Sequence, residues 1–104
     1  MNNKIKTFKD FYPFYLSEHM HPICRLLHFT GTFGVITLIL ISIVFSNKVW
    51  MYAPLCGYFF AWIGHFVFEK NRPATFKYPI YSMIGDFLMF YHLLIRKEKF
   101  SSTK

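Results

Sequence analysis

Two long apolar segments, separated by only three residues, constrain the fold of this chain more than any other feature. The first runs from Leu26 to Phe45 and the second from Val49 to Phe68, and each has twenty residues. A helix of that length spans about 30 Å, which matches the hydrocarbon core of a bilayer. The link over 46–48 is so short that two such helices must run antiparallel. The sequence therefore predicts an all-α membrane protein built on a transmembrane helical hairpin.

Composition indicates that much of this apolar surface faces lipid. The chain has 104 residues, of which 54% are hydrophobic and 22% are aromatic. A soluble domain this small could not bury so much apolar surface, so we treat residues 1–104 as a single integral-membrane domain. The formal net charge of +7 comes from Lys and Arg that flank the apolar segments. That placement favours membrane lipids with anionic headgroups as partners, and we expect no binding to nucleic acid.

A third apolar segment follows, from Ile80 to Ile95, and it differs from the first two. It has sixteen residues and contains Asp86 and His92. It is short for a transmembrane helix, and a carboxylate that faces lipid is costly. Asp86 should therefore face other helices or the cytoplasm, in a salt bridge, in an N-terminal helix contact, or as a partner of a metal-binding histidine. We expect a short third helix over 80–95 that is peripheral or re-entrant.

The distribution of basic residues predicts the topology. Lys and Arg concentrate in the N-terminal region, in the loop over 70–77 and in the C-terminal tail, whereas the link over 46–48 has one lysine. Because cytoplasmic loops carry the excess of Lys and Arg, both termini and the 70–77 loop should be cytoplasmic. Two spans with peripheral N-terminal and C-terminal helices satisfy this rule, and a third span would not. In a bacterium, the membrane would be the inner membrane.

Two histidines are predicted to lie at the same depth in the membrane. His28 is nineteen residues before Asn47, the tip of the hairpin, and His65 is eighteen residues after it. At about 1.5 Å per residue, both helices return to roughly 28 Å from the tip. The two imidazoles should therefore meet at the cytoplasmic edge of the hairpin.

Other side chains able to bind metal lie close to these two in the sequence. His19 and His21 precede Pro22, which suits the first position of a helix, so His19 should lie in a separate segment that turns back. Glu69 is one helical turn beyond His65. A metal site for iron or zinc is one interpretation. Hydrogen bonding of interfacial histidines to headgroups or backbone is the other, and it is also open for His92.

Small residues recur in both apolar segments. Ala53, Gly57 and Ala61 are spaced four residues apart, and Gly31 and Gly34 lie in the first segment. Such spacing lets helices approach closely in lipid. Close packing explains these residues better than a ligand groove does. We also expect self-association of the chain through this stripe.

Four motifs together resemble a known family. FYPFYLSEH, RLLHFTGT, GHFVFEKNRPATFKYP and YSMIGDFLMF occur in that order, and they are similar to the Mpo-like family of small membrane proteins over about residues 8–95. Its best-known eukaryotic member is a 2-hydroxy fatty acid dioxygenase of the endoplasmic reticulum. The resemblance implies an iron(II)-dependent membrane oxidoreductase of fatty acid α-oxidation. Such an enzyme uses O₂ to shorten a 2-hydroxy fatty acid by one carbon.

The resemblance also implies roles for particular residues. The histidine pattern of the family falls on His19, His28 and His65, which would bind the metal, and Glu69 in the same motif would bind or orient it. Arg72 follows closely, and its guanidinium could hold the substrate carboxylate through two hydrogen bonds. The family pattern has Asn at positions 21 and 24, where this chain has histidine and cysteine.

Two other classes of function fit the same sequence. One is a non-catalytic membrane protein that binds lipid through its basic, aromatic edge. The other is a haem protein in which His28 and His65 are the axial ligands. A non-catalytic lipid-binding protein would hold no stoichiometric metal, and a haem protein would show a strong Soret band.

Overall fold

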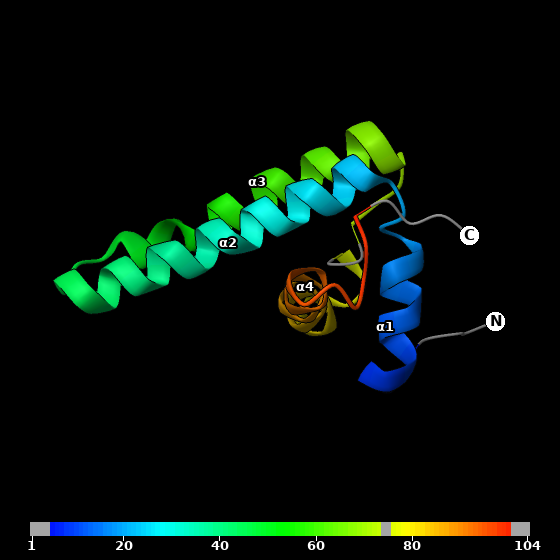
Figure 1. Cartoon of the computed structure of the whole chain (residues 1–104), viewed down its shortest axis with the longest axis horizontal. Helices are drawn as coiled ribbons and strands as arrows, with labels where there is room; N and C mark the ends of the chain where they lie inside the picture. The colour runs from blue at the N-terminus through cyan, green and yellow to red at the C-terminus, as the bar shows by residue number, and fades with distance from the viewer. Residues whose placement is uncertain (1–4, 74–75, 101–104) are drawn as a thin grey trace.

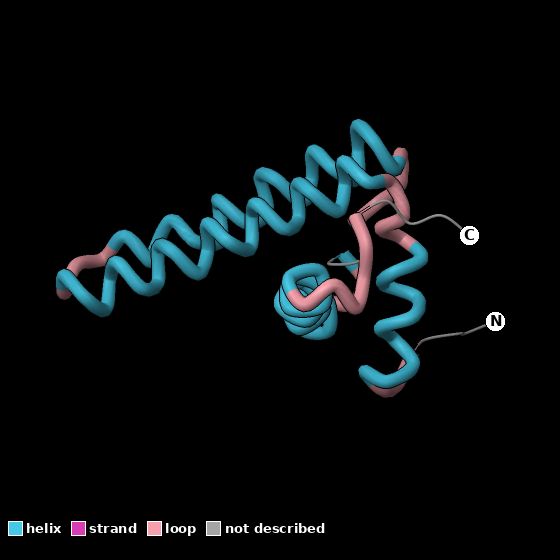
Figure 2. Tube along the Cα trace, in the orientation of Figure 1, coloured by secondary structure: helices cyan, strands magenta, loops and turns pink. Residues whose placement is uncertain are grey.

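The computed structural model describes residues 5–73 and 76–100 of the chain. This part of the chain is helical and contains no strand, as Figure 2 shows, which confirms the predicted all-α class. The elements in chain order are α1 (Phe8–Ser17), α2 (Pro22–Phe45), the 3₁₀ helix η1 (Val49–Tyr52), α3 (Ala53–Ile63), the π-helix η2 (Gly64–Glu69) and α4 (Pro79–Leu94).

The predicted hairpin forms the long axis of the molecule. α2 runs antiparallel to the continuous helical stretch made by η1, α3 and η2, and the two lie side by side (Figure 1). Both stretches, Pro22–Phe45 and Val49–Glu69, are long and apolar enough to cross a membrane. No other helix among the described residues meets that criterion. The remaining helices α1 and α4 correspond to the N-terminal and C-terminal helices that the sequence predicts.

The tip of the hairpin is closed by local hydrogen bonds. α2 ends at Phe45, and its C-cap Ser46 adopts the left-handed conformation with φ of 52°. Asn47 Oδ1 then accepts a hydrogen bond from the Val49 amide at 3.2 Å, and Ser42 Oγ accepts one from the Trp50 amide at 2.7 Å. These bonds satisfy backbone groups that the helix ends leave free, and they allow the chain to reverse over three residues.

The two long helices approach each other through their glycines. A Cβ added to Gly34 would lie 2.7 Å from Cys56 Sγ, and one added to Gly57 would lie 3.3 Å from Val35. A larger side chain at Gly34 would require the Cys56 side chain to move, and one at Gly57 would require a small shift of Val35. The predicted close packing through small residues is confirmed, and in this structure it occurs within one chain.

α1 and α4 pack against each other beside one end of the hairpin. α4 is seen nearly end-on in Figure 1, so it runs across the direction of α2 and α3, and it contacts α2 and α1. A Cβ on Gly85 of α4 would lie 3.0 Å from the Tyr15 ring of α1, so the two helices are in close contact there. The buried apolar residues that these segments share are Phe11, Tyr15, Tyr78, Met89 and Leu93.

Candidate metal centre

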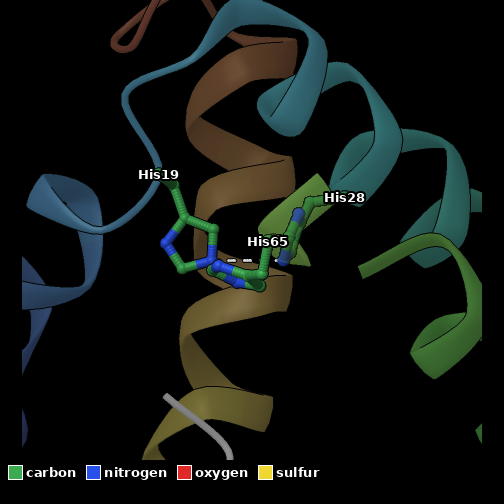
Figure 3. Close-up of side chains that lie close together, drawn as sticks. All are labelled: His19, His28 and His65. Atoms are coloured by element: carbon green, nitrogen blue, oxygen red, sulfur yellow. Dashed lines mark hydrogen bonds between the residues drawn. The ribbon is translucent and has the colours of Figure 1, made fainter. Parts of the chain in front are cut away.

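Three buried histidines from three separate segments meet at one point. His19 lies in the link between α1 and α2, His28 in α2 and His65 in η2 (Figure 3). Each offers one ring nitrogen, and these three atoms lie within 4.8 Å of one another. The ring centroids of His28 and His65 are 4.9 Å apart, which confirms that the two helices bring them to the same level.

Arg25 holds the link that carries His19. Its Nε donates a hydrogen bond to the His19 carbonyl at 2.5 Å. Its Nη1 donates to the Lys99 carbonyl at 2.6 Å and forms an ion pair with Glu98 at 3.1 Å. Arg25 is 1% exposed. The sequence indicated Arg25 only as one of the cytoplasmic charges, and its burial beside the histidines was not predicted.

The π-helix η2 and the residues after it position His65. A π-helix has a wider turn than an α-helix and is often found at functional sites. The helix ends at Lys70, which has φ of 61°, and this turn brings Asn71 back to His65. Asn71 Oδ1 accepts a hydrogen bond from His65 Nδ1 at 2.7 Å, and its Nδ2 donates to the Glu18 carbonyl at 3.1 Å. The role of Asn71 was not predicted, although it lies within the longest quoted motif.

The hydrogen bonds of the three rings define their tautomers. His19 Nδ1 donates to the Tyr15 carbonyl at 2.5 Å, and His28 Nδ1 donates to the Cys24 carbonyl at 2.9 Å. With the bond from His65 to Asn71 Oδ1, every Nδ1 faces an oxygen that can only accept. Each neutral ring therefore carries its proton on Nδ1, and its Nε2 is left with an unshared lone pair.

These lone pairs face each other and make the cluster suitable for a cation. His19 Nε2 and His28 Nε2 are 3.1 Å apart, and neither has a proton to share with the other. Buried polar atoms normally have a partner, and one metal ion would serve all three nitrogens. With a metal–nitrogen distance of about 2.1 Å, neighbouring ligands of one ion lie roughly 3.0–3.4 Å apart. Imidazole ligands suit iron and zinc alike.

Burial and the neighbouring histidines keep His19 in its metal-binding form. Burial lowers the pKa of His19 well below its ordinary value, and the neighbouring His28 and His65 lower it further. A histidine binds metal through its neutral form. His19 is therefore neutral at pH 7 and does not need to lose a proton before it binds a metal.

Glu69 lies outside this cluster. Its Oε2 accepts a hydrogen bond from the His21 backbone amide at 2.5 Å. His21 is the N-cap of α2, and its Nδ1 accepts a hydrogen bond from the Ile23 amide at 3.1 Å. Both side chains thus act at the start of α2, and neither belongs to the group of residues whose ligand atoms converge.

His92 and Arg72 are also separate from the cluster. His92 Nδ1 forms a hydrogen bond with the Tyr12 hydroxyl at 2.8 Å. Arg72 is exposed and lines a surface hollow with neighbours from α1 and from the segment before α4. The hollow is lined by Phe14, Glu18, Arg72, Pro73, Phe76, Lys77 and Tyr78.

An apolar cavity of about 350 Å³ leads away from His28 between α2, α3 and α4. It extends along α2 from His28 to Ile39 and along the second helix from Ala61 to Trp50. The small residues Ala53, Gly57 and Ala61 all line it. They therefore form a groove wall in addition to allowing close packing, although the sequence favoured packing over a groove.

Asp86 lies on the wall of the same cavity and is connected to His19 through Tyr15. The Tyr15 hydroxyl donates a hydrogen bond to Asp86 Oδ1. The Tyr15 ring stacks on His19 with centroids 4.0 Å apart. Burial raises the pKa of Asp86 to about 7, against the opposite effect of the Tyr15 hydrogen bond. Asp86 is thus not a direct partner of a histidine in the cluster.

The haem interpretation does not fit this geometry. Two imidazoles that bind one haem iron from opposite faces have ring centroids about 6 Å apart, given metal–nitrogen distances of about 2 Å. The centroids of His28 and His65 are 4.9 Å apart, which is closer than axial ligation of one haem requires. The arrangement therefore favours a single metal ion over haem.

Comparison with models of known protein families gives a match over most of the chain. The model of a protein family described as "2-hydroxy-palmitic acid dioxygenase Mpo1-like" matches residues 5–98. This range contains all three histidines of the cluster, Asn71 and Asp86. No curated protein and no solved structure matches the chain.

Proposed function

The chain belongs to the 2-hydroxy-palmitic acid dioxygenase Mpo1-like family, and we propose that it is an iron(II)-dependent membrane dioxygenase that shortens 2-hydroxy fatty acids by one carbon. The observation that supports this proposal is that the histidine cluster and the apolar cavity meet at one residue. Three buried imidazoles with converging Nε2 atoms lie at one end of an apolar cavity, and His28 belongs to both. An enzyme that acts on the polar end of a lipid needs this combination of a polar site and an apolar chamber.

The reaction is balanced without an external reductant. A 2-hydroxy acid, R–CHOH–COOH, and O₂ give R–COOH, CO₂ and H₂O. The bond between C1 and C2 is broken, C2 becomes the new carboxyl carbon and O₂ is reduced. Iron(II), when bound, supplies the redox chemistry for the activation of O₂.

His19, His28 and His65 would hold the iron through Nε2. Their Nδ1 hydrogen bonds to the Tyr15 carbonyl, the Cys24 carbonyl and Asn71 fix the ring orientations. Such outer partners are a regular part of metal sites and keep the ligands in position. Three neutral ligands also leave coordination positions for substrate and O₂. We propose that Glu69 acts as a positioning residue, through its bond to the start of α2.

The apolar cavity would take the acyl chain. Its α2 wall runs from His28 to Ile39, which is eleven residues or about 16 Å of helix. A C–C bond of about 1.5 Å advances an extended chain by about 1.25 Å, so this length holds roughly thirteen carbons. The cavity therefore favours a long-chain acid as substrate.

The basic residues near the cluster would receive the carboxylate of the substrate. Lys70 and Arg72 follow η2 directly, and Arg72 and Lys77 share the exposed hollow beside α1. Exposed cations at the mouth of a site raise the local concentration of anionic substrates. We propose that Arg72 acts in this way, with both termini and the 70–77 loop in the cytoplasm.

The test combines metal analysis with oxygen uptake on the purified protein. The wild type should bind one iron per chain and consume O₂ with long-chain 2-hydroxy acids, but not with the unhydroxylated acids. Alanine variants of His19, His28 and His65 should lose both properties, whereas alanine at His92 provides a matched control outside the cluster. A protein that binds lipid but holds no stoichiometric metal would support the non-catalytic alternative. Iron-loaded wild type with no O₂ uptake on either acid would refute the proposed activity.

A further inference from the structure

One acidic residue lies on the wall of the apolar cavity, and nothing in the proposed metal site makes use of it. Asp86 is the single acidic residue among the residues that line the cavity. Most of the other lining residues are apolar, and those with polar side-chain groups include His28, Thr32 and Tyr58. A carboxyl group on an apolar wall is costly unless it is hydrogen-bonded, so its presence needs an explanation.

The carboxyl group of Asp86 is held at one oxygen and free at the other. Oδ1 accepts the hydrogen bond of the Tyr15 hydroxyl. No residue in the described ranges, 5–73 and 76–100, forms a hydrogen bond with Oδ2. The close contact between the Tyr15 ring and Gly85 limits movement of this pair. Oδ2 is thus a fixed polar atom whose natural partner is a molecule in the cavity.

The position of Asp86 indicates which part of a ligand it meets. Asp86 and His28 line the same cavity, and Tyr15 connects Asp86 to His19, so Asp86 lies at the end of the cavity near the histidines. The opposite end is formed by Ile39 and Trp50. A fatty acid whose tail fills the apolar part would have its first two carbons beside Asp86.

A hydroxyl group is the best match for Asp86 in either protonation state. A hydroxyl both donates and accepts hydrogen bonds, so it can donate to the carboxylate or accept from the neutral acid. A methylene group at the same carbon offers neither bond and would leave Oδ2 buried without a partner. Sites built to bind a hydroxyl discriminate strongly against the analogue that lacks it.

We propose, on the basis of the function proposed above, that Asp86, held by Tyr15, hydrogen-bonds the 2-hydroxyl of the acid bound in the cavity and so selects it over the unhydroxylated acid. Asp86 acts here as a specificity residue for C2. The histidines would hold the metal, and the apolar walls of the cavity would bind the acyl chain.

The experiment measures binding and does not depend on turnover. Purified protein under nitrogen is titrated with 2-hydroxyhexadecanoic acid and with hexadecanoic acid, each displacing a fluorescent fatty acid. The wild type should prefer the hydroxy acid by at least about tenfold, the usual value of one hydrogen bond to a charged group. Asp86→Leu should reduce this ratio to near one, because the hydroxy acid loses its partner and hexadecanoic acid no longer leaves a polar atom unpaired, whereas Asp86→Asn should retain most of it. Met83→Leu, on the same wall, is the matched control and should behave as the wild type.

Two results would overturn the proposal: no preference in the wild type, and a preserved preference in Asp86→Leu. If His28→Ala loses the preference that Asp86→Leu keeps, recognition of the hydroxyl belongs to the metal. Because oxygen uptake is not measured, failure of the dioxygenase activity gives a different result from failure of this inference.

A second measurement covers the case in which Asp86→Leu does not fold. The chain has two aspartates, Asp10 and Asp86. With ¹³C-labelled aspartate carboxyl groups in zinc-loaded wild type, the Asp86 resonance should shift on addition of the hydroxy acid but not of hexadecanoic acid. Asp10, which is exposed on α1, is an internal control and should not shift. An unchanged Asp86 resonance with bound hydroxy acid would contradict the proposed contact.

Discussion

Replacement of Asn71 by alanine should weaken metal binding without removing a ligand. Asn71 Oδ1 is the acceptor for His65 Nδ1 at 2.7 Å, so its loss frees the His65 ring to rotate. Loss of such a partner typically reduces metal affinity by about 10–100-fold, or about 1.4–2.7 kcal/mol. Asn71 also binds the Glu18 carbonyl and Oε1 at 3.1 and 3.3 Å, which connect η2 to the link that carries His19. Because two ligands are loosened together, we expect the upper end of this range.

The same substitution should also lower stability. Three hydrogen bonds of a half-buried side chain are lost, at about 0.5–1.5 kcal/mol each, so the free energy of unfolding should fall by roughly 1.5–4.5 kcal/mol. Asn71→Asp separates the two effects, because a carboxylate accepts the His65 bond but cannot donate to Glu18. It should therefore bind metal more tightly than Asn71→Ala while remaining less stable than the wild type.

Competition with a chelator of known affinity measures the change in metal binding. The control is Asn47→Ala, the same substitution in the exposed tip of the hairpin, where Oδ1 accepts only from the Val49 amide. It should leave metal affinity unchanged. Wild-type affinity in a folded Asn71→Ala variant would refute the reasoning, since His65 would then not depend on Asn71 for its orientation.

Three further predictions follow from the cavity, the charge state and the topology. Gly57→Leu should fill the middle of the cavity and shift oxygen uptake toward shorter 2-hydroxy acids. Trp50→Ala should extend the far end of the cavity and admit longer acids. An unchanged chain-length profile in both variants would show that the acyl chain lies elsewhere. Burial lowers the pKa of His19 below its ordinary value, so the unfolded state takes up a proton more readily than the folded state. The metal-free protein should therefore lose stability as pH falls below about 6.5. Denaturant unfolding between pH 7.5 and pH 5 measures this, and higher stability at pH 5 would contradict it. Cysteines placed at Lys48 and Lys97 should react with impermeant reagents from opposite sides of the membrane, and labelling from one side would show that α4 spans.

The hairpin and the central pair of histidines could be predicted because they depend on regular geometry. Two apolar segments with a three-residue link permit little other than an antiparallel pair, and a constant helical rise brings His28 and His65 to one level. Pro22 marked the start of α2, which placed His19 in a separate segment. The rise per residue of a helix does not depend on the details of side-chain packing. The predicted level of the two histidines is therefore found in the structure.

The supporting residues could not be predicted because they depend on irregular backbone. Asn71 reaches His65 only because η2 is a π-helix that ends in a left-handed residue, and no periodicity in the sequence indicates this. Arg25 was one of several cations near a membrane edge, and charge counting does not distinguish a buried cation from an exposed one. The partnership of Tyr15 with Asp86 joins residues that are 71 positions apart, and it requires the crossing of α1 and α4.

The central claim is that His19, His28 and His65 bind one metal ion through Nε2. X-ray absorption at the iron edge, on protein loaded with one iron per chain, tests it most directly. The account predicts scattering from three imidazole rings with iron–nitrogen distances of about 2.1 Å, and no such spectrum from His65→Ala, which should not retain iron. A spectrum fitted by oxygen ligands alone, or one that is unchanged in His65→Ala, would contradict the assignment of the metal centre.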